Sequence, residues 1–439
     1  MRRVSATADG IGHGHGYAQL FCSKFFDMAE QLYRVGLNTF DHELKRYIDG
    51  SYWWNVPMSP GRLNSIFPIA AKHYPDPLYR VETKPSLIHG EPPPFKGKPA
   101  DISNLHSVNF PNSGVTILRR PWKEDTIAAE FKWSMPDNRG EFSVLSLGLY
   151  FNGYTCQSYP GHFHWGSTDL PHDWQIQSAS HSTIVVDRRN QSGMKDYIKD
   201  HYMPHASKQI FFDEGKEASS TVAYNDRMYP GVEIWRAVSV LDGAYLVLDM
   251  LRSDEEHVYD RWFHGVPDKS NGLEGISLDM KPRTEPLGDT DGYEMVQNFH
   301  SATTDKDFGA DWAIKDENIK GNLNLAMRVL NDAPLEAIHG FEWSRQYRTP
   351  EKEFLLMSRK ARNADFVVLF EPHRGKSKLS GFERFTVQDE NGKNVDGALG
   401  LHINLGGKSY EVIMNPDMKE IKTIKGTTRK VLSVEKVKG

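Results

Sequence analysis

The chain has 439 residues, of which 38% are hydrophobic, 25% charged and 11% aromatic. This composition excludes a disordered chain, a collagen-like repeat and a coiled coil, and with 36 Gly and 24 Pro it favours a largely β protein with many turns. The 53 Lys and Arg against 58 Asp and Glu give a net charge of −5, which lacks the global basic field of a nucleic-acid-binding protein.

The N-terminal residues Met1–Gly10 combine a basic start with no apolar stretch behind it, so no signal peptide is predicted. The chain has no run of about 18 or more apolar residues, so no membrane-spanning segment is expected. Two cysteines, Cys22 and Cys156, cannot form a disulfide framework, and no paired zinc-binding cysteines are present. Both cysteines are therefore expected to be buried thiols.

Two helices are predicted near the N-terminus. In the first, over residues 18–35, apolar side chains recur at alternating spacings of four and three, and Gly36 supplies a helix stop. These side chains are Phe21, Phe25, Met28, Leu32 and Val35. The second helix is shorter and is expected to begin at Asp41 as N-cap and to end at Gly50. Residues 75–100 contain seven prolines and few apolar residues, which predicts a semi-rigid linker and a domain boundary.

The rest of the chain, from residue 101 to 439, is predicted to form a large antiparallel β-sandwich, either undivided or divided into two sub-sheets. From about Val115 the apolar residues alternate, and residues 143–151 place Leu145, Leu147, Leu149 and Phe151 on one face of a strand. Turn dipeptides that favour hairpins stand at 242–243, 391–392 and 406–407. Short strands separated by such turns are typical of a sandwich.

A glycine-rich loop, Asp9–Tyr17, leads directly into the first predicted helix. Its glycines would let the backbone approach a ligand, and the helix N-terminus favours a nearby anion. His13 and His15 share one side of an extended loop, with Tyr17 at the start of the helix. The loop is interpreted as an acid/base pair of tyrosine and histidine, with a flexible segment or an adventitious metal site as the alternatives.

A second polar segment, Tyr159–Gly166, contains His162 and His164 and precedes a strand headed by His181. A metal site here would need a third ligand from Glu141, Asp169 or His181, and no spacing is diagnostic of zinc. The other interpretation is that these histidines are surface or packing groups. Trp165 is a candidate platform for stacking a sugar. The segment Asp260–His264 is either a further polar site or a strand with a core histidine.

Taken in order, several segments resemble the heparinase II/III-like polysaccharide lyases. Asp9–Tyr17 and the helix behind it resemble the end of the family's helical toroid, and His181–Asp187 with Gln191 is similar to its His-Asn-Thr-x-Val-Val-Asp…Gln motif. The other matching segments are Leu145–Gly153 with Pro160–Gly161, Trp235–Val238, Arg261–His264 and Phe366–Pro372.

The resemblance implies an α/α toroid followed by a C-terminal antiparallel β-sandwich. Residues 1–74 would then be the last helices of an incomplete toroid, 75–100 the linker, and 101–439 the sandwich region. The family's members suggest a periplasmic or secreted protein, if the true N-terminus is missing. The implied substrate is an acidic, uronate-containing polysaccharide, and the implied reaction is β-elimination.

The resemblance also implies roles for individual residues. Tyr17 is expected to act as base and acid with His15 and His13 beside it, and His181 and Tyr159 are expected to line the cleft from the sandwich side. Elimination requires a base for the C5 proton and an acid for the leaving O4. A tyrosine, whose unperturbed pKa is about 10, can act as base where cations and donors stabilise its phenolate. Substrate contacts are expected from Trp53, Trp54, Arg62 and Trp165.

The chain departs from the family at its metal ligands. Where many members carry His-x-Asp it has Glu141–Ser143, and Tyr159 replaces an Asp before Pro-Gly. No cofactor is therefore expected to be required, and a zinc or calcium ion would need His162 and His164 beside His181. The departure favours an alternative function, a non-catalytic carbohydrate-binding sandwich. A glycoside hydrolase using Asp9 and Glu141 is a third hypothesis.

Overall fold

The computed structural model describes most of the C-terminal two thirds of the chain and a few short N-terminal segments. The described residues are 28–29, 31–37, 73–74, 106–111, 114–120, 126–134, 142–151, 154–157, 170–191, 207–265, 272–314, 322–344, 347–417, 421–422, 428–429 and 431–437.

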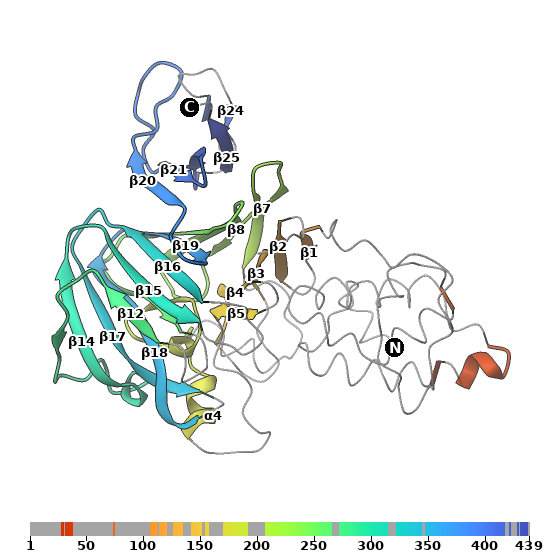
Figure 1. Cartoon of the computed structure of the whole chain (residues 1–439), viewed down its shortest axis with the longest axis horizontal. Coiled ribbons are helices and arrows are strands. Elements are labelled where there is room, and N and C mark those ends of the chain that lie inside the picture. The colour runs from red at the N-terminus through yellow and green to blue at the C-terminus, as the bar shows by residue number, and fades with distance from the viewer. Residues whose placement is uncertain are drawn as a thin grey trace.

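Antiparallel sheets dominate this part of the chain, as predicted (Figure 1). A five-stranded sheet has the order β1-β2-β3-β4-β5, and an eight-stranded sheet has the order β12-β15-β16-β19-β10-β9-β8-β7. The strands of the first are β1 (Val108–Phe110), β2 (Val115–Arg119), β3 (Ile127–Lys132), β4 (Ser146–Phe151) and β5 (Tyr154–Gln157). Those of the second are β7 (Lys208–Glu214), β8 (Ser219–Asn225), β9 (Val232–Val240), β10 (Tyr245–Ser253), β12 (Leu273–Ile276), β15 (Phe308–Ile314), β16 (Leu323–Leu330) and β19 (Ala364–His373).

A six-stranded sheet with the order β13-β14-β17-β18-β11-β6 faces the eight-stranded sheet, and a four-stranded sheet, β20-β21-β22-β25, is formed near the C-terminus. The six strands are β6 (Ile184–Val186), β11 (His257–His264), β13 (Lys281–Pro282), β14 (Gln297–Thr304), β17 (Leu335–Ser344) and β18 (Tyr347–Ala361). The four are β20 (Leu379–Phe385), β21 (Leu399–Leu405), β22 (Lys408–Met414) and β25 (Leu432–Val437), with a small β23 (Ile421–Lys422) and β24 (Thr428–Arg429) pair beside them. The short helices are α4 (Leu170–Gln175), η4 (Ser178–Ser180) and η6 (Tyr293–Met295).

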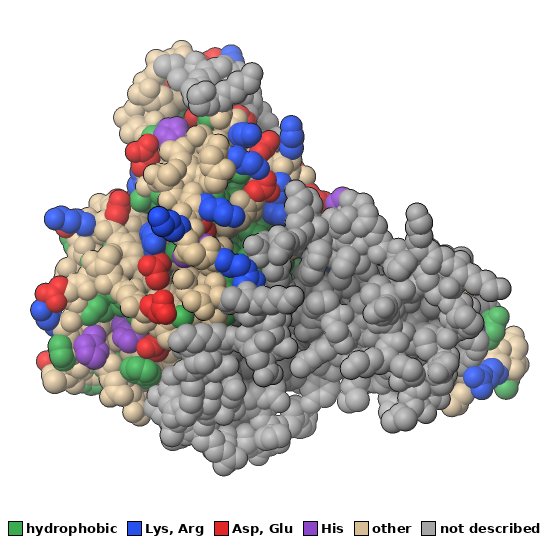
Figure 2. All heavy atoms as spheres, in the orientation of Figure 1, with side chains coloured by type: hydrophobic (Ala, Val, Ile, Leu, Met, Phe, Trp, Pro, Cys, Tyr) green, Lys and Arg blue, Asp and Glu red, His purple; other side chains and the backbone are tan. Residues whose placement is uncertain are grey.

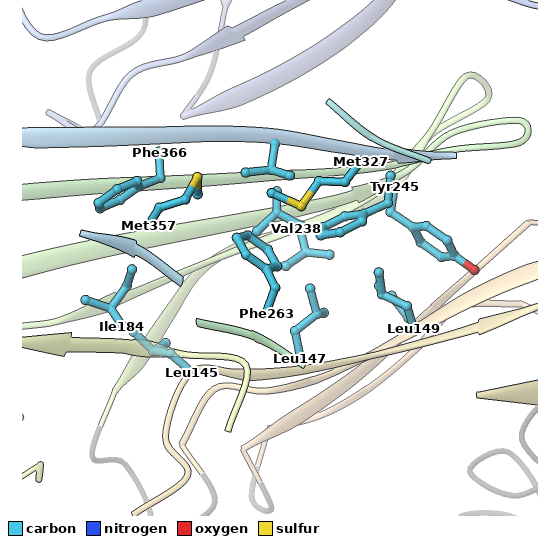
Figure 3. Close-up of a cluster of buried hydrophobic side chains, with 14 of the residues drawn as sticks. Leu145, Leu147, Leu149, Ile184, Val238, Tyr245, Phe263, Met327, Met357 and Phe366 are labelled. Carbon is cyan, nitrogen blue, oxygen red and sulfur yellow. The ribbon is translucent and has the colours of Figure 1, made fainter. Parts of the chain in front are cut away.

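The main core lies where the five-, six- and eight-stranded sheets face one another (Figure 3). Alternate residues of each strand point into it: Leu147 and Leu149 from β4, Val238 from β9, Phe263 from β11 and Met357 from β18. All five side chains are almost fully buried. Apolar burial stabilises a fold by roughly 25 cal/mol per Å², so this shared core joins the three sheets into one sandwich.

A second apolar layer joins the four-stranded sheet to the opposite face of the eight-stranded sheet. On β10, Leu246 and Leu248 point into this layer, while Tyr245 and Val247 point into the main core. Because both faces of β10 are covered, the strand is apolar at consecutive positions rather than alternating.

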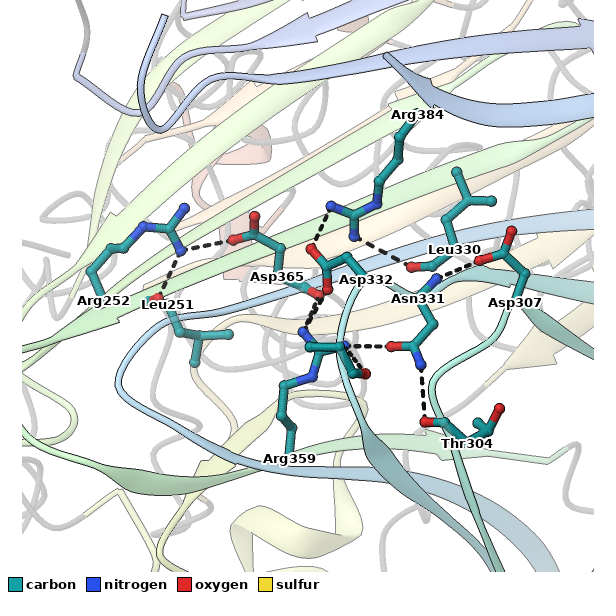
Figure 4. A network of polar contacts seen from close by, with 11 residues as sticks. Leu251, Arg252, Thr304, Asp307, Leu330, Asn331, Asp332, Arg359, Asp365 and Arg384 are labelled. Carbon is teal, nitrogen blue, oxygen red and sulfur yellow. Dashed lines mark hydrogen bonds and ion pairs between the residues drawn. The ribbon is translucent and has the colours of Figure 1, made fainter. Parts of the chain in front are cut away.

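Polar contacts reinforce this junction (Figure 4). Asp332, in the turn between β16 and β17, accepts hydrogen bonds from Arg384 Nη1 of β20 at 2.8 Å and from Arg359 Nη1 of β18 at 2.8 Å.

A second carboxylate at this junction is Asp242, in the turn between β9 and β10. It accepts hydrogen bonds from Arg120 Nε at 2.9 Å and from Lys408 Nζ at 2.5 Å. Burial opposes ionisation of Asp242, but these two cations hold its pKa below the ordinary value. On the face shown in Figure 2, basic and acidic side chains are interspersed over the described sheets.

The predicted hairpins are confirmed. Gly243 has a φ of 105° in the turn between β9 and β10, and Gly392 has a φ of 76° in a turn closed by a 2.8 Å bond from Asp389 N to Lys393 O. Gly406 and Gly407 form the two-residue link between β21 and β22 with φ values of 58° and 73°, as a type I′ turn requires.

One strand begins later than predicted. Leu145 has a φ of 60°, in the left-handed region, and the strand starts after it, at Ser146. Its side chain nevertheless joins Leu147, Leu149 and Phe151 in the main core, as the alternation predicts.

Part of the first predicted helix is described. Residues 28–29 and 31–34 are helical, and Gly36 ends the helix with a φ of 88°. Bonds from Leu37 N to Leu32 O and from Gly36 N to Tyr33 O close its C-terminus. Two positions of the predicted apolar face are exposed in this structure, Met28 at 46% and Val35 at 75%.

The second predicted helix and residues 75–100 lie outside the described residues, so the domain boundaries stay predictions. None of the helices in the part of the chain that the structure describes has the length and apolar character needed to span a bilayer.

Candidate active site

Of the site residues predicted from the sequence, the structure describes His181. The others lie outside the described residues and stay predictions: Tyr17, His15, His13, Tyr159, Trp53, Trp54, Arg62, Trp165, His162, His164, Asp169, Asp9 and Glu141.

His181 directly follows the η4 turn and is 1% exposed. Its backbone N–H donates to Ser178 O at 3.1 Å, and its Nε2 lies 3.1 Å from Gln175 O. Because a backbone carbonyl can only accept, Nε2 carries the proton in this contact. The ring is therefore held in one orientation by the end of α4.

The residues that follow His181 in the motif fix the start of β4. Thr183 Oγ1 donates to Val144 O at 2.8 Å. Gln191 donates from Nε2 to the same carbonyl at 3.0 Å and accepts at Oε1 from Val144 N at 3.1 Å. All three residues are buried. The side chains thus satisfy both backbone groups of Val144, which would otherwise be buried without partners.

Gln191→Leu is expected to lower the free energy of unfolding by about 2 kcal/mol, because it leaves a buried N–H unpaired and weakens one carbonyl contact. Urea denaturation followed by circular dichroism measures the change. The exposed Gln388, whose side chain bonds only loosely to Asn394 Oδ1 at 3.3 Å, is the matched control, and Gln388→Leu should change stability by less than about 0.5 kcal/mol. Equal losses in the two variants would contradict the role assigned to Gln191.

The aspartate of the motif has a structural role. Asp187 and Arg188 have φ values of 52° and 57° and form the tight turn that ends β6. Asp187 Oδ1 accepts from Val258 N at 2.9 Å, and Oδ2 lies 2.7 Å from His257 Nδ1. The carboxylate therefore fastens the turn to the start of β11.

A cluster of three buried ions lies in the main core next to this region. Asp249 of β10 accepts from Arg236 Nε of β9 at 2.5 Å and from Arg261 Nε of β11 at 2.8 Å. The three side chains are 0% exposed. Arg236 Nη1 also donates to Ser182 O at 2.8 Å and to Leu145 O. The cluster thus joins the five-, six- and eight-stranded sheets at one point. We name these three residues the core ion cluster.

The outer face of β11 holds a second set of buried polar groups. Asp260 Oδ2 accepts from Tyr293 OH at 2.7 Å, and burial raises the pKa of Asp260 although bonds from Ser358 and Tyr293 oppose the rise. His264 Nδ1 lies 2.7 Å from Glu342 Oε2, and Lys352 Nζ lies 3.1 Å from Glu342 Oε1. The interpretation of His264 as a core histidine is confirmed.

These partners were missed by the sequence analysis, and no local pattern could have found them. Glu342 is 78 positions from His264 in the chain, and Asp249 and Arg236 belong to different strands. Strand pairing brings them together.

The described residues do not by themselves assemble a metal site. Among them, no group of three or more His, Cys, Asp or Glu side chains is placed to hold an ion. At the position of the family's Asp ligand stands Ser143, a buried neutral hydroxyl that binds zinc poorly. Ligation by His162, His164 and His181 stays a prediction.

The overall structure is similar to those of solved polysaccharide lyases. A mutant of the heparan sulfate lyase HepC from Pedobacter heparinus matches with a TM-score of 0.62 at 14% identity, covering 93% of this chain and 59% of that one. Heparinase III matches with a TM-score of 0.64 at 11% identity, covering 94% of this chain and 62% of that one. The chain thus spans about three fifths of these proteins, and at such identities the likeness shows the fold alone.

In sequence, no curated protein matches the chain. The family model described as "Heparinase II/III-like, C-terminal" matches residues 103–330, which include the five-stranded sheet, the His181 motif and the core ion cluster. This match covers more than half of the chain, which therefore belongs to the heparinase II/III-like family.

Proposed function

We propose that the chain is a polysaccharide lyase that cleaves a uronate-containing polysaccharide by β-elimination. The observation that carries the proposal is the family match over residues 103–330, with the His181 motif inside it. One of the similar structures is named as a heparan sulfate lyase and another as heparinase III, and the first name supports an acidic polysaccharide as the substrate class.

In the proposed mechanism Tyr17 removes the C5 proton as phenolate and then protonates the departing O4. His15 and His13 stabilise the phenolate, which lowers the pKa of the tyrosine into a range where it can act as base. Charge also develops on the uronate carboxylate, and donors aimed at that group would stabilise the transition state. Trp53, Trp54, Arg62 and Trp165 bind the polymer on either side of the cleaved bond.

His181 and Tyr159 contribute from the sandwich side of the cleft. The contact of His181 Nε2 with Gln175 O gives the ring a single orientation, and its backbone is fixed on both sides by Ser178 and Thr183. A group held in this way loses little entropy when it engages a substrate, which favours a part in catalysis or binding.

Tyr17→Phe is expected to lower the lyase rate at least about 100-fold, because it removes the group that transfers both protons. The assay follows the ultraviolet absorbance of the unsaturated uronate product on alginate, ulvan and glycosaminoglycans, using the full chain. Tyr33→Phe is the control, since Tyr33 lies on the predicted helix that follows Tyr17 and is 46% exposed, and it should retain the wild-type rate. No absorbance change with any of these polymers would overturn the proposal.

The departure at Glu141–Ser143 favours a second candidate, a non-catalytic carbohydrate-binding sandwich. Saturable binding of an acidic polysaccharide without cleavage would select it. New reducing ends without an unsaturated product would instead identify a glycoside hydrolase using Asp9 and Glu141.

A further inference from the structure

The two arginines of the core ion cluster differ in what their terminal nitrogens reach. Arg236 Nη1 donates to the carbonyls of Leu145 and Ser182, whereas Arg261 Nη1 donates at 2.6 Å to the carbonyl of Trp262, its neighbour on β11. Leu145 directly precedes β4, and Ser182 directly follows His181. Arg236 therefore links the start of one strand to the residue beside the candidate catalytic histidine.

The contact with Leu145 falls on a strained residue. Its φ of 60° is a left-handed conformation that a leucine keeps only where the surrounding structure imposes it. Gln191 and Thr183 hold the preceding residue, Val144, and Arg236 holds the carbonyl of Leu145 from the eight-stranded sheet. The corner before β4 is thus fixed from two sides, and strain of this kind is concentrated at functional sites.

The charge balance of the cluster is poorly suited to a purely stabilising role. Two cations surround one carboxylate, and all three side chains are fully buried. Burial, followed by the charge of Arg236, lowers the pKa of Arg261 to about 9. Replacing a buried ion cluster with apolar residues often leaves stability unchanged or raises it. A gain in stability therefore does not explain why the cluster contains a second arginine, whereas the contacts of the arginines with backbone carbonyls do.

We propose that Arg236 is a positioning residue of the site: by holding the carbonyls of Leu145 and Ser182 in fixed places, it sets the position of the His181 side chain. The inference rests on the proposed lyase function, but the position of the His181 ring can be measured without a substrate.

The test compares Arg236→Met with Arg261→Met. Each variant removes one buried positive charge and leaves Asp249 paired with the other arginine, so the two are matched in charge and burial. Arg236→Met is expected to lower kcat about 100-fold with KM within about twofold of wild type, because a displaced catalytic group affects the rate more than substrate binding. Arg261→Met should retain kcat within about threefold.

A second readout follows His181 directly. In protein labelled with ¹³C at the histidine rings, the His181 signal is assigned by its loss in His181→Gln. Arg236→Met should shift this signal, and Arg261→Met should leave it in place. An unmoved signal in Arg236→Met, or equal losses of kcat in both variants, would overturn the inference.

The two proposals fail in different ways. If the wild-type chain has no lyase activity, the proposed function is wrong. The positioning role of Arg236 is then tested by the His181 signal without the kinetic measurement. Thermal denaturation shows whether each variant folds. If Arg236→Met does not fold, Arg236→Lys replaces it in the test. The single Nζ of lysine keeps the positive charge but cannot form hydrogen bonds to Asp249 and to both carbonyls at once. Arg236→Lys is then expected to lower kcat and shift the His181 signal, and an unmoved signal or a kcat loss equal to that of Arg261→Met would overturn the inference.

Discussion

Asp249→Asn is expected to lower the free energy of unfolding by about 3–5 kcal/mol, which is a large part of the stability of most domains. The carboxylate accepts hydrogen bonds from Arg236 and Arg261, and all three side chains are 0% exposed. Its neutralisation would leave two buried cations without a counter-charge. Urea denaturation followed by circular dichroism and by tryptophan fluorescence measures the loss.

Asp365→Asn is the matched control for this effect. Asp365 also pairs with an arginine, Arg252, at 2.7 Å, but both side chains are partly exposed, at 19% and 25%. Solvent screens such a pair, so its loss should cost less than about 1 kcal/mol. The triple variant Asp249→Leu, Arg236→Met, Arg261→Met should recover most of the stability, because it removes all three buried charges. A small loss in Asp249→Asn, similar to that of the control, would show that the cluster's charge is compensated in another way.

Glu342→Gln is expected to have the second largest effect, about 3 kcal/mol. Glu342 lies between His264 Nδ1 at 2.7 Å and Lys352 Nζ at 3.1 Å, and all three side chains are 0% exposed. With glutamine in its place, the buried ammonium of Lys352 would lose the negative charge that lies 3.1 Å from it. The same denaturation experiment measures the change.

The control for Glu342 lies on the same strand. Glu336 pairs with Arg283 Nη1 at 2.6 Å, with the two side chains 32% and 17% exposed, so Glu336→Gln should cost less than about 1 kcal/mol. Adding Lys352→Met to Glu342→Gln should restore part of the loss, because the buried cation that relied on the carboxylate is then absent. Failure of the second substitution to restore stability would argue that His264, rather than Lys352, depends on the carboxylate.

The alternating strands and the turns could be predicted from the sequence because their causes are local. A two-residue link of Gly406 and Gly407 permits the positive φ values of a type I′ turn, whatever the rest of the chain does. Alternation likewise predicts which side chains of β4 are buried, and these do enter the main core. The start of β4 could not be predicted, since the left-handed conformation of Leu145 depends on contacts from Gln191 and Arg236.

At the candidate site, too, some features follow from the local sequence and others only from the tertiary structure. His181 could be singled out from its motif, but the motif does not reveal that Thr183 and Gln191 satisfy Val144, or that Asp187 fastens a turn to β11. Each of these bonds joins residues at least 39 positions apart, and a buried polar group takes whichever partner the packed strands bring near.

The sequence by itself determined the mainly β class, the hairpin turns and the family resemblance, because turn chemistry, alternation and short motifs are properties of neighbouring residues. Only the tertiary structure decided that Arg236, Asp249 and Arg261 meet in the core, and that Arg236 reaches the residue beside His181. The physical reason is that a charge is buried only with its partner, and here the partners come from three strands of two facing sheets. Strand order and sheet packing, rather than any local pattern, therefore set the surroundings of the site.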